Sequence, residues 1–121
     1  MNHFAESLHV LSSSRLFKAL GDPTRLRIVA LLSQSELCVC HIESALGLPQ
    51  PTVSRHMAVL RNAEVVESER RGTWIFYRLA EQPDRVAKRQ LRGLVAAFRE
   101  IDELKHEVKR LLRSKGPDAC R

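Results

Sequence analysis

Two cysteines one residue apart, Cys38 and Cys40, are the residues of this chain whose types and spacing favour a specific chemistry. Thiolates bind soft, thiophilic metal ions in preference to hard cations. Residues i and i+2 of an α-helix point about 200° apart. Both thiols therefore reach one ion only where this segment is extended, or where the first turn of a following helix unwinds. The pair predicts a thiophilic metal site coupled to the local backbone.

The third cysteine, Cys120, lies in a short C-terminal segment that we expect to be a flexible tail, residues 116–121. It is either an exposed spare thiol or a third sulfur ligand. Because an unstrained disulfide needs a particular Cα separation, a bridge between Cys38 and Cys40 is disfavoured. Oxidation of these thiols in a redox sensor stays an alternative to metal binding.

The pattern around the cysteines predicts a helix-turn-helix. A short helix is expected over 38–46, ended by Gly47, and a second helix over 52–62. The next residues read as a hairpin, with strands over 64–69 and 73–79 that flank a turn at Arg70 to Gly72. A basic hairpin directly after the second helix of a helix-turn-helix is the wing of a winged helix.

The second helix and the wing carry groups that suit base edges and phosphates in DNA. These groups are small hydroxyls, an amide and guanidiniums. The candidate DNA-binding residues are Gln50, Thr52, Ser54, Arg55, Arg61, Arg70 and Arg71. A formal net charge of +6 agrees with a nucleic-acid partner without requiring one.

Helical spacing also covers both ends of the chain. Residues 8–20 predict one helix or two short ones, and residues 84–113 predict a single long helix. Such a helix is too long to bury its apolar stripe on a small core, which favours a second copy of the chain as partner. The expected fold is mainly α with a β-hairpin wing, a winged helix-turn-helix that dimerises through terminal helices. Residues 1–115 would form this DNA-binding and dimerisation domain.

The composition disfavours other classes of protein. The 121 residues contain no apolar run of the ~20 residues that would span a bilayer. The N-terminus lacks a secretory signal pattern, so we expect a cytoplasmic protein without a membrane partner. A nucleophile–base motif and a glycine-rich phosphate loop are both absent from the sequence, so we expect no enzyme and no catalytic cofactor.

Four segments together resemble the ArsR/SmtB family of metal-responsive winged-helix repressors. They are residues 22–28, 36–40, 52–61 and 72–79. The resemblance implies a homodimer that binds double-stranded operator DNA and is released when a metal binds. It implies Cys38 and Cys40 as the metal ligands, and the Glu-Leu-Cys-Val-Cys sequence is similar to the site of sensors for arsenite, As(III), and antimonite, Sb(III).

The chain departs from the family patterns at three places. Many arsenite sensors have a third cysteine where this chain has Glu43. Cadmium and lead sensors use N-terminal cysteines, and residues 1–35 contain none. Zinc sensors use paired ligands on the final helix, which here has only His106. Arsenite or antimonite is thus the expected effector, and a cadmium- or lead-responsive repressor or a thiol-redox-responsive one is the alternative.

Overall fold

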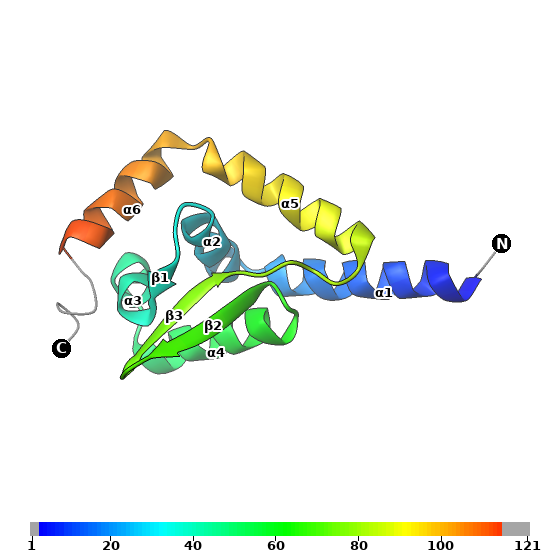
Figure 1. Ribbon diagram of the computed structural model, residues 1–121, viewed down its shortest axis with the longest axis horizontal. Helices are drawn as coiled ribbons and strands as arrows, with labels where there is room; N and C mark the ends of the chain where they lie inside the picture. Colours follow the sequence, from blue (N-terminus) through cyan, green and yellow to red (C-terminus); the bar gives the residue numbers. More distant parts are fainter. Residues whose placement is uncertain (1–2, 115–121) are drawn as a thin grey trace.

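A computed structural model describes residues 3–114 of the chain, which form six helices and three short strands (Figure 1). The elements are α1 (His3–Leu20), α2 (Pro23–Leu32), β1 (Leu37–Cys38), α3 (Val39–Leu46), α4 (Gln50–Asn62), β2 (Val66–Arg71), β3 (Trp74–Leu79), α5 (Arg85–Arg99) and α6 (Asp102–Ser114). The fold is a winged helix, as the sequence predicts. The expected tail at 116–121 lies outside the described residues.

Local capping explains where the central helices begin and end. Asp22 is the N-cap of α2, and its Oδ1 accepts hydrogen bonds from the backbone N–H groups of Thr24 and Arg25 at 2.8 and 3.1 Å. Pro23 occupies the first turn, where its missing N–H removes no helical bond. Gly47 ends α3 with φ of 65°, a left-handed conformation that glycine adopts without a steric penalty.

The three strands form an antiparallel sheet in the order β1-β3-β2. The predicted hairpin is present, but its turn is shorter than expected. Arg70 and Arg71 pair with Ile75 and Trp74, so both arginines belong to β2 and only residues 72–73 turn the chain. Two-residue turns match the twist of paired strands, which accounts for the tighter hairpin.

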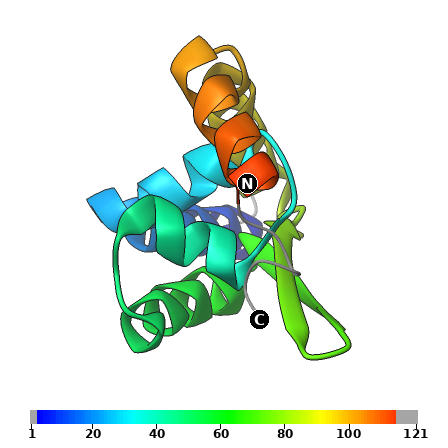
Figure 2. The ribbon, with the colours of Figure 1, turned by 90° about the vertical axis from the view of Figure 1, so that its left-hand side faces the viewer.

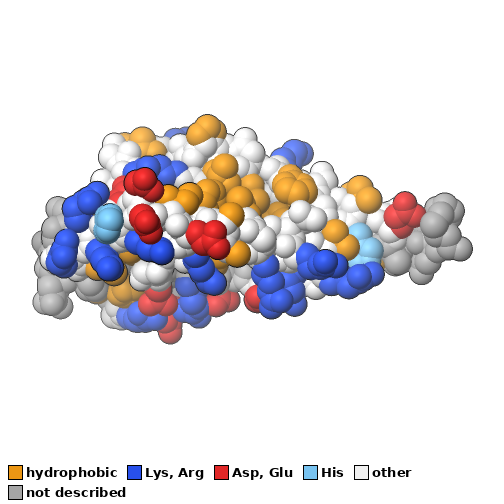
Figure 3. All heavy atoms as spheres, turned by 90° about the horizontal axis from the view of Figure 1, so that it is seen from above, with side chains coloured by type: hydrophobic (Ala, Val, Ile, Leu, Met, Phe, Trp, Pro, Cys, Tyr) orange, Lys and Arg blue, Asp and Glu red, His pale blue; other side chains and the backbone are white. Residues whose placement is uncertain are grey.

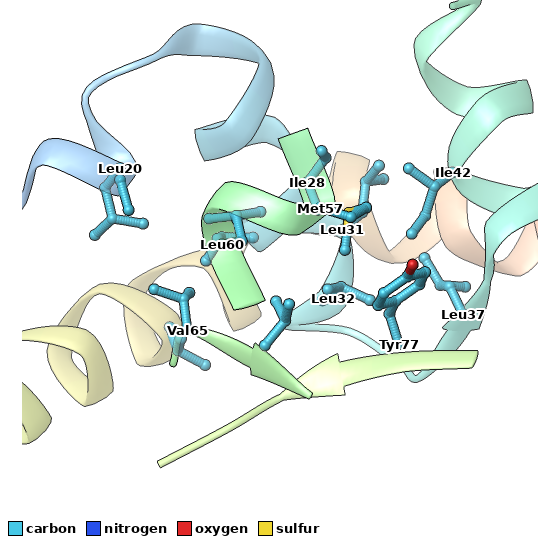
Figure 4. Close-up of a cluster of buried hydrophobic side chains, with 14 of the residues drawn as sticks. Leu20, Ile28, Leu31, Leu32, Leu37, Ile42, Met57, Leu60, Val65 and Tyr77 are labelled. Carbon is cyan, nitrogen blue, oxygen red and sulfur yellow. The ribbon is translucent and has the colours of Figure 1, made fainter. Parts of the chain in front are cut away.

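The core lies where the sheet meets α2, α3 and α4 (Figure 4). Leu31, Leu37, Ile42 and Met57 are at most 1% exposed, and Tyr77 of β3 is 7% exposed beside them. Burial of a side chain of this size contributes about 1.5–3 kcal/mol. The segment that contains Cys38 is therefore held on both sides by core residues.

The single helix predicted over 84–113 is wrong. The N–H groups of Glu100 and Ile101 bond to the carbonyls of Ala97 and Phe98 at 3.3 and 3.1 Å. These bonds span three residues rather than four, so the helix tightens and stops. The Phe98 carbonyl also accepts a bond from Gln34 Nε2 at 3.1 Å, which satisfies the end of α5 from the loop after α2.

Beyond this break α6 folds back onto the same chain (Figure 1). Val108 and Leu111 are 3% and 9% exposed, and Arg27 of α2 bonds to Glu107 at 2.6 Å. The apolar stripe for which the sequence favoured a partner helix is thus partly buried within a single chain. None of the helices within residues 3–114 combines the length and apolar character needed to cross a bilayer.

Candidate metal centre and nucleic-acid interface

The change from strand to helix falls between the two cysteines. Cys38 is the last residue of β1 and the N-cap of α3, with an extended backbone at φ −80° and ψ 163°, and α3 begins at Val39. The Sγ atoms of Cys38 and Cys40 lie 2.6 Å apart. The predicted helix start at Cys38 is therefore one residue too early, and the sulfur atoms of Cys38 and Cys40 converge without any unwinding of α3.

A buried imidazole lies beside the two thiols. Ligand atoms of Cys38, Cys40 and His41 all lie within 4.8 Å of one another, the only such group of three among residues 3–114. His41 is 2% exposed, and its Nδ1 accepts a hydrogen bond from the Cys38 backbone N–H at 2.9 Å. Glu43, at the position of the family's third cysteine, is not in the group, and Cys120 lies outside the described residues.

Two sulfurs and an imidazole nitrogen are donors that suit soft or borderline metal ions. Metal–thiolate bonds of about 2.3 Å put two sulfurs on a common ion at a separation of roughly 3.5–4 Å. The thiols of Cys38 and Cys40 therefore need to move apart by about 1 Å to hold one ion. Cys38 is fully buried and Cys40 is partly exposed, so solvent reaches the pair from the Cys40 side.

The thiol segment is bonded directly to the wing. In the sheet, Cys38 pairs with Phe76 and Leu37 pairs with Tyr77. One residue earlier, Glu36 forms an ion pair with Arg71 of β2 at 2.6 Å. The segment around Cys38 is thus joined to β3 by backbone pairing and to β2 by a charged contact.

Helix α4 lies beside the β2–β3 hairpin (Figure 2) and presents one apolar and one polar face. Val53, Met57 and Leu60 are at most 1% exposed, which fixes α4 on the core. The other face holds the predicted DNA-binding residues Gln50, Thr52, Ser54, Arg55 and Arg61, all exposed or partly exposed. Gln50 Nε2 donates to Ser54 Oγ at 2.6 Å, so these two side chains form one polar surface at the N-terminal end of α4.

The wing arginines point in different directions. Arg71 bonds to Glu69 at 2.6 Å, and its guanidinium carbon lies 4.4 Å from the centre of the Phe76 ring. Arg70 is exposed and, as a neighbour in a strand, faces the opposite side of the sheet. Arg61 Nη1 donates to Ser68 Oγ of β2 at 3.4 Å. Within residues 3–114, Arg55 and Arg70 make no ion pair, whereas Arg71 is engaged with carboxylates.

A recognition-type helix, an adjacent basic hairpin and a supporting helix with one cysteine at its N-cap and another in its first turn define a winged-helix DNA-binding regulator. Residues 22–68 match the sequence profile of the bacterial regulatory proteins of the arsR family. The chain is 40% identical over 92 residues to the arsenic resistance transcriptional regulator ArsR1 of Pseudomonas putida strain KT2440. This match covers 75% of this chain and 72% of the relative. The chain belongs to the arsR family of transcriptional regulators.

Two further comparisons agree with membership of this family. The chain is 49% identical over 67 residues to the arsenical resistance operon repressor of Escherichia coli strain K12, a match that covers 54% of this chain and 57% of the relative. The solution structure of the homodimeric winged helix-turn-helix DNA-binding domain of Mb0332 from Mycobacterium bovis superposes with a TM-score of 0.64 at 28% identity. That superposition covers 85% of this chain and 88% of the other.

The metal-site residues expected from the sequence do not include His41. The signal that points to it is positional: His41 stands three residues after the N-cap, where a side chain reaches back to the N-cap backbone N–H. That signal depends on which residue is the N-cap. The helix predicted from the sequence begins at Cys38, so Cys38 was not expected to be the N-cap of α3.

Proposed function

We propose that this chain is a homodimeric repressor of metal-resistance genes that binds operator DNA and is released by trivalent arsenic or antimony bound to Cys38 and Cys40. The observation that carries the proposal is the convergence of two cysteine sulfur atoms, those of Cys38 and Cys40, which lie 2.6 Å apart on a segment paired with the wing. Names of relatives that refer to arsenic and arsenical resistance support the choice of effector.

The chemistry of capture needs only the two thiols and water. Each thiol displaces one hydroxyl of As(OH)₃, so that an S–As bond forms, an As–O bond breaks, and the thiol proton leaves with the hydroxyl as water. Two such steps leave arsenic with one remaining oxygen ligand. Cys120 is our proposed third sulfur, and it would replace that oxygen in the same way.

The DNA interface that we propose consists of the polar face of α4 and the wing. The residues are Gln50, Thr52, Ser54, Arg55, Arg61, Arg70 and Arg71. The hydroxyl and amide groups suit base edges, and the guanidiniums suit phosphates. Because α3 contacts α4 and β1 pairs with β3, bound arsenic would move both parts of this interface when it displaces Cys38.

The proposed dimer uses the terminal helices. Leu8, Val10, Leu11 and Phe17 of α1 are 47%, 61%, 58% and 54% exposed, so α1 holds several large apolar side chains open to solvent. Figure 3 shows apolar side chains open to solvent, with acidic and basic side chains around them, on the face seen from above. A second copy of the chain is the partner that the homodimeric relative favours.

The test is fluorescence anisotropy with a labelled fragment of the promoter of the chain's own gene, with tris(2-carboxyethyl)phosphine present to suppress oxidation. We expect arsenite to release the wild-type protein but not Cys38→Ser or Cys40→Ser. Cys120→Ser is the matched control for a thiol outside the pair, and a weaker response there would support a third sulfur. Release of both Cys38→Ser and Cys40→Ser at the wild-type arsenite concentration contradicts the proposed site.

A further inference from the structure

We propose that His41 is a positioning residue, whose imidazole holds Cys38 in the extended conformation from which its thiol meets that of Cys40. The inference rests on the proposed function, since it concerns how the same pair of thiols is prepared for an effector. It assigns to His41 the role of a hydrogen-bond acceptor for the backbone and not that of a metal ligand.

The geometry of the helix start carries this inference. His41 is the third residue of α3, and its Nδ1 accepts the Cys38 N–H at 2.9 Å in a buried setting. The arrangement is a capping box, in which glutamate or glutamine normally supplies the side-chain acceptor. An imidazole with an unprotonated Nδ1 serves the same purpose, and burial of its ring keeps water from replacing it.

This hydrogen bond fixes the point at which the strand becomes a helix. A buried backbone N–H needs a partner, and Cys38 donates its own to α3 rather than onward along the sheet. Loss of the imidazole leaves that N–H unsatisfied. The backbone of Cys38 is then free to adopt helical angles, at which the thiols of residues i and i+2 point apart.

The same contact argues against direct ligation by His41. A neutral imidazole has one nitrogen that accepts and one that carries the proton. Because Nδ1 accepts from Cys38, the proton lies on Nε2, and neither nitrogen has a lone pair left for a metal. Groups that orient ligands in this way change metal affinity by roughly 10–100-fold when they are removed.

Phenylarsine oxide is the probe that tests this role, because its arsenic binds two thiols and releases its oxygen as one water. Its binding to wild type, His41→Ala, His41→Leu, His41→Gln and Cys38→Ser would be followed by titration. We expect Cys38→Ser to lose chelation, and His41→Ala and His41→Leu to lose about 10-fold or more in affinity. His41→Gln restores the capping acceptor and should bind within about threefold of wild type.

Amide hydrogen exchange at Cys38 gives a second readout that does not depend on arsenic. The Cys38 N–H should be protected in wild type and His41→Gln and exchange faster in His41→Ala and His41→Leu. His41→Leu keeps a similar apolar volume, so it remains folded where the alanine variant leaves a cavity.

The outcomes separate this inference from the proposed function. If both His41→Ala and His41→Leu bind phenylarsine oxide as tightly as wild type while Cys38→Ser does not, the positioning role is overturned and the thiol site stands. If His41→Gln loses as much affinity as His41→Ala, the imidazole acts as a ligand or a packing group, which also overturns it. If Cys38→Ser binds like wild type, the thiol site itself fails.

Discussion

Glu36 Oε1 and Arg71 Nη1 lie 2.6 Å apart, and this ion pair joins the segment before Cys38 to the wing. Arg71 also bonds to Glu69 at 2.6 Å, and the two carboxylates, Glu36 first, raise the pKa of Arg71 above its ordinary value. The side chains of Arg71 and Glu36 are 45% and 30% exposed, so solvent screens the ion pair and it adds little to stability. In the proposed DNA interface, Glu36 and a DNA phosphate would compete for the guanidinium of Arg71.

Replacement of Glu36 by glutamine should therefore tighten DNA binding. Removal of one competing carboxylate frees Arg71 for a phosphate, and we expect the affinity for promoter DNA to rise about threefold at low salt, with a steeper salt dependence. The same variant should respond less to arsenite, because the charged contact from the thiol segment to β2 is lost. DNA titrations at several salt concentrations, with and without arsenite, measure both effects.

Glu67→Gln is the matched control for Glu36→Gln. It makes the same change in charge on the wing, but Glu67 bonds to Arg78 at 2.6 Å and not to Arg71. Equal changes in DNA affinity for the two variants would show that net charge alone is responsible, and the competition for Arg71 would be excluded.

Arg55 gives the clearest test of the DNA interface on α4. It is exposed, and it makes no ion pair within residues 3–114. We expect Arg55→Ala to weaken promoter binding by about 10-fold and to lower the slope of log affinity against log salt by about 1. Arg113→Ala removes the same charge from the end of α6 and should leave that slope nearly unchanged. A slope equal to wild type in Arg55→Ala would remove this residue from the interface.

The helix-turn-helix and the wing could be predicted because their signals are local. Gly47 and the β-branched and aromatic residues of β3 act on their immediate neighbours, and the end of α3 and the strand β3 lie where they are expected. The two-residue strand β1 gave no such signal. It exists because Leu37 and Cys38 pair with residues of β3 that are distant in the sequence.

The break between α5 and α6 could not be predicted for a related reason. Neither Glu100 nor Ile101 is a helix breaker, and the apolar spacing runs through them. The helix ends there because Gln34 takes up the Phe98 carbonyl and because α6 gains a buried face against α3. The direction of Arg71 is likewise set by Glu36, a residue on a separate element.

Gly47 should matter for stability and not for effector chemistry. Its φ is 65°, and a Cβ added there would meet no atom within 4 Å. The penalty of Gly47→Ala is therefore conformational, about 1–2 kcal/mol in the free energy of unfolding. Gly47→Asn should lose less, because asparagine tolerates this conformation. Urea unfolding measures both, and equal stability of the alanine variant and wild type would contradict the left-handed turn.

Asp84 connects the two terminal helical regions through its carboxylate. Its Oδ2 accepts from the N–H groups of Val86 and Ala87 at 3.0 Å each, as the N-cap of α5. Its Oδ1 lies 2.6 Å from Nδ1 of His9 in α1. The backbone N–H of Ala87 and, after it, the His9 side chain hold the pKa of Asp84 below its ordinary value.

A carboxylate with a lowered pKa in the folded state stabilises that state above the unfolded pKa of about 3.9, and this stability is lost as the pH falls. Asp84→Asn keeps an N-cap acceptor but removes the titration. We therefore expect its stability to fall less steeply than that of wild type between about pH 5 and pH 2. Urea midpoints across this range provide the measurement, with Asp102→Asn, on an exposed carboxylate 3.5 Å from Lys105, as control. If Asp84→Asn follows the acid profile of wild type, the carboxylate at the start of α5 does not contribute to acid sensitivity.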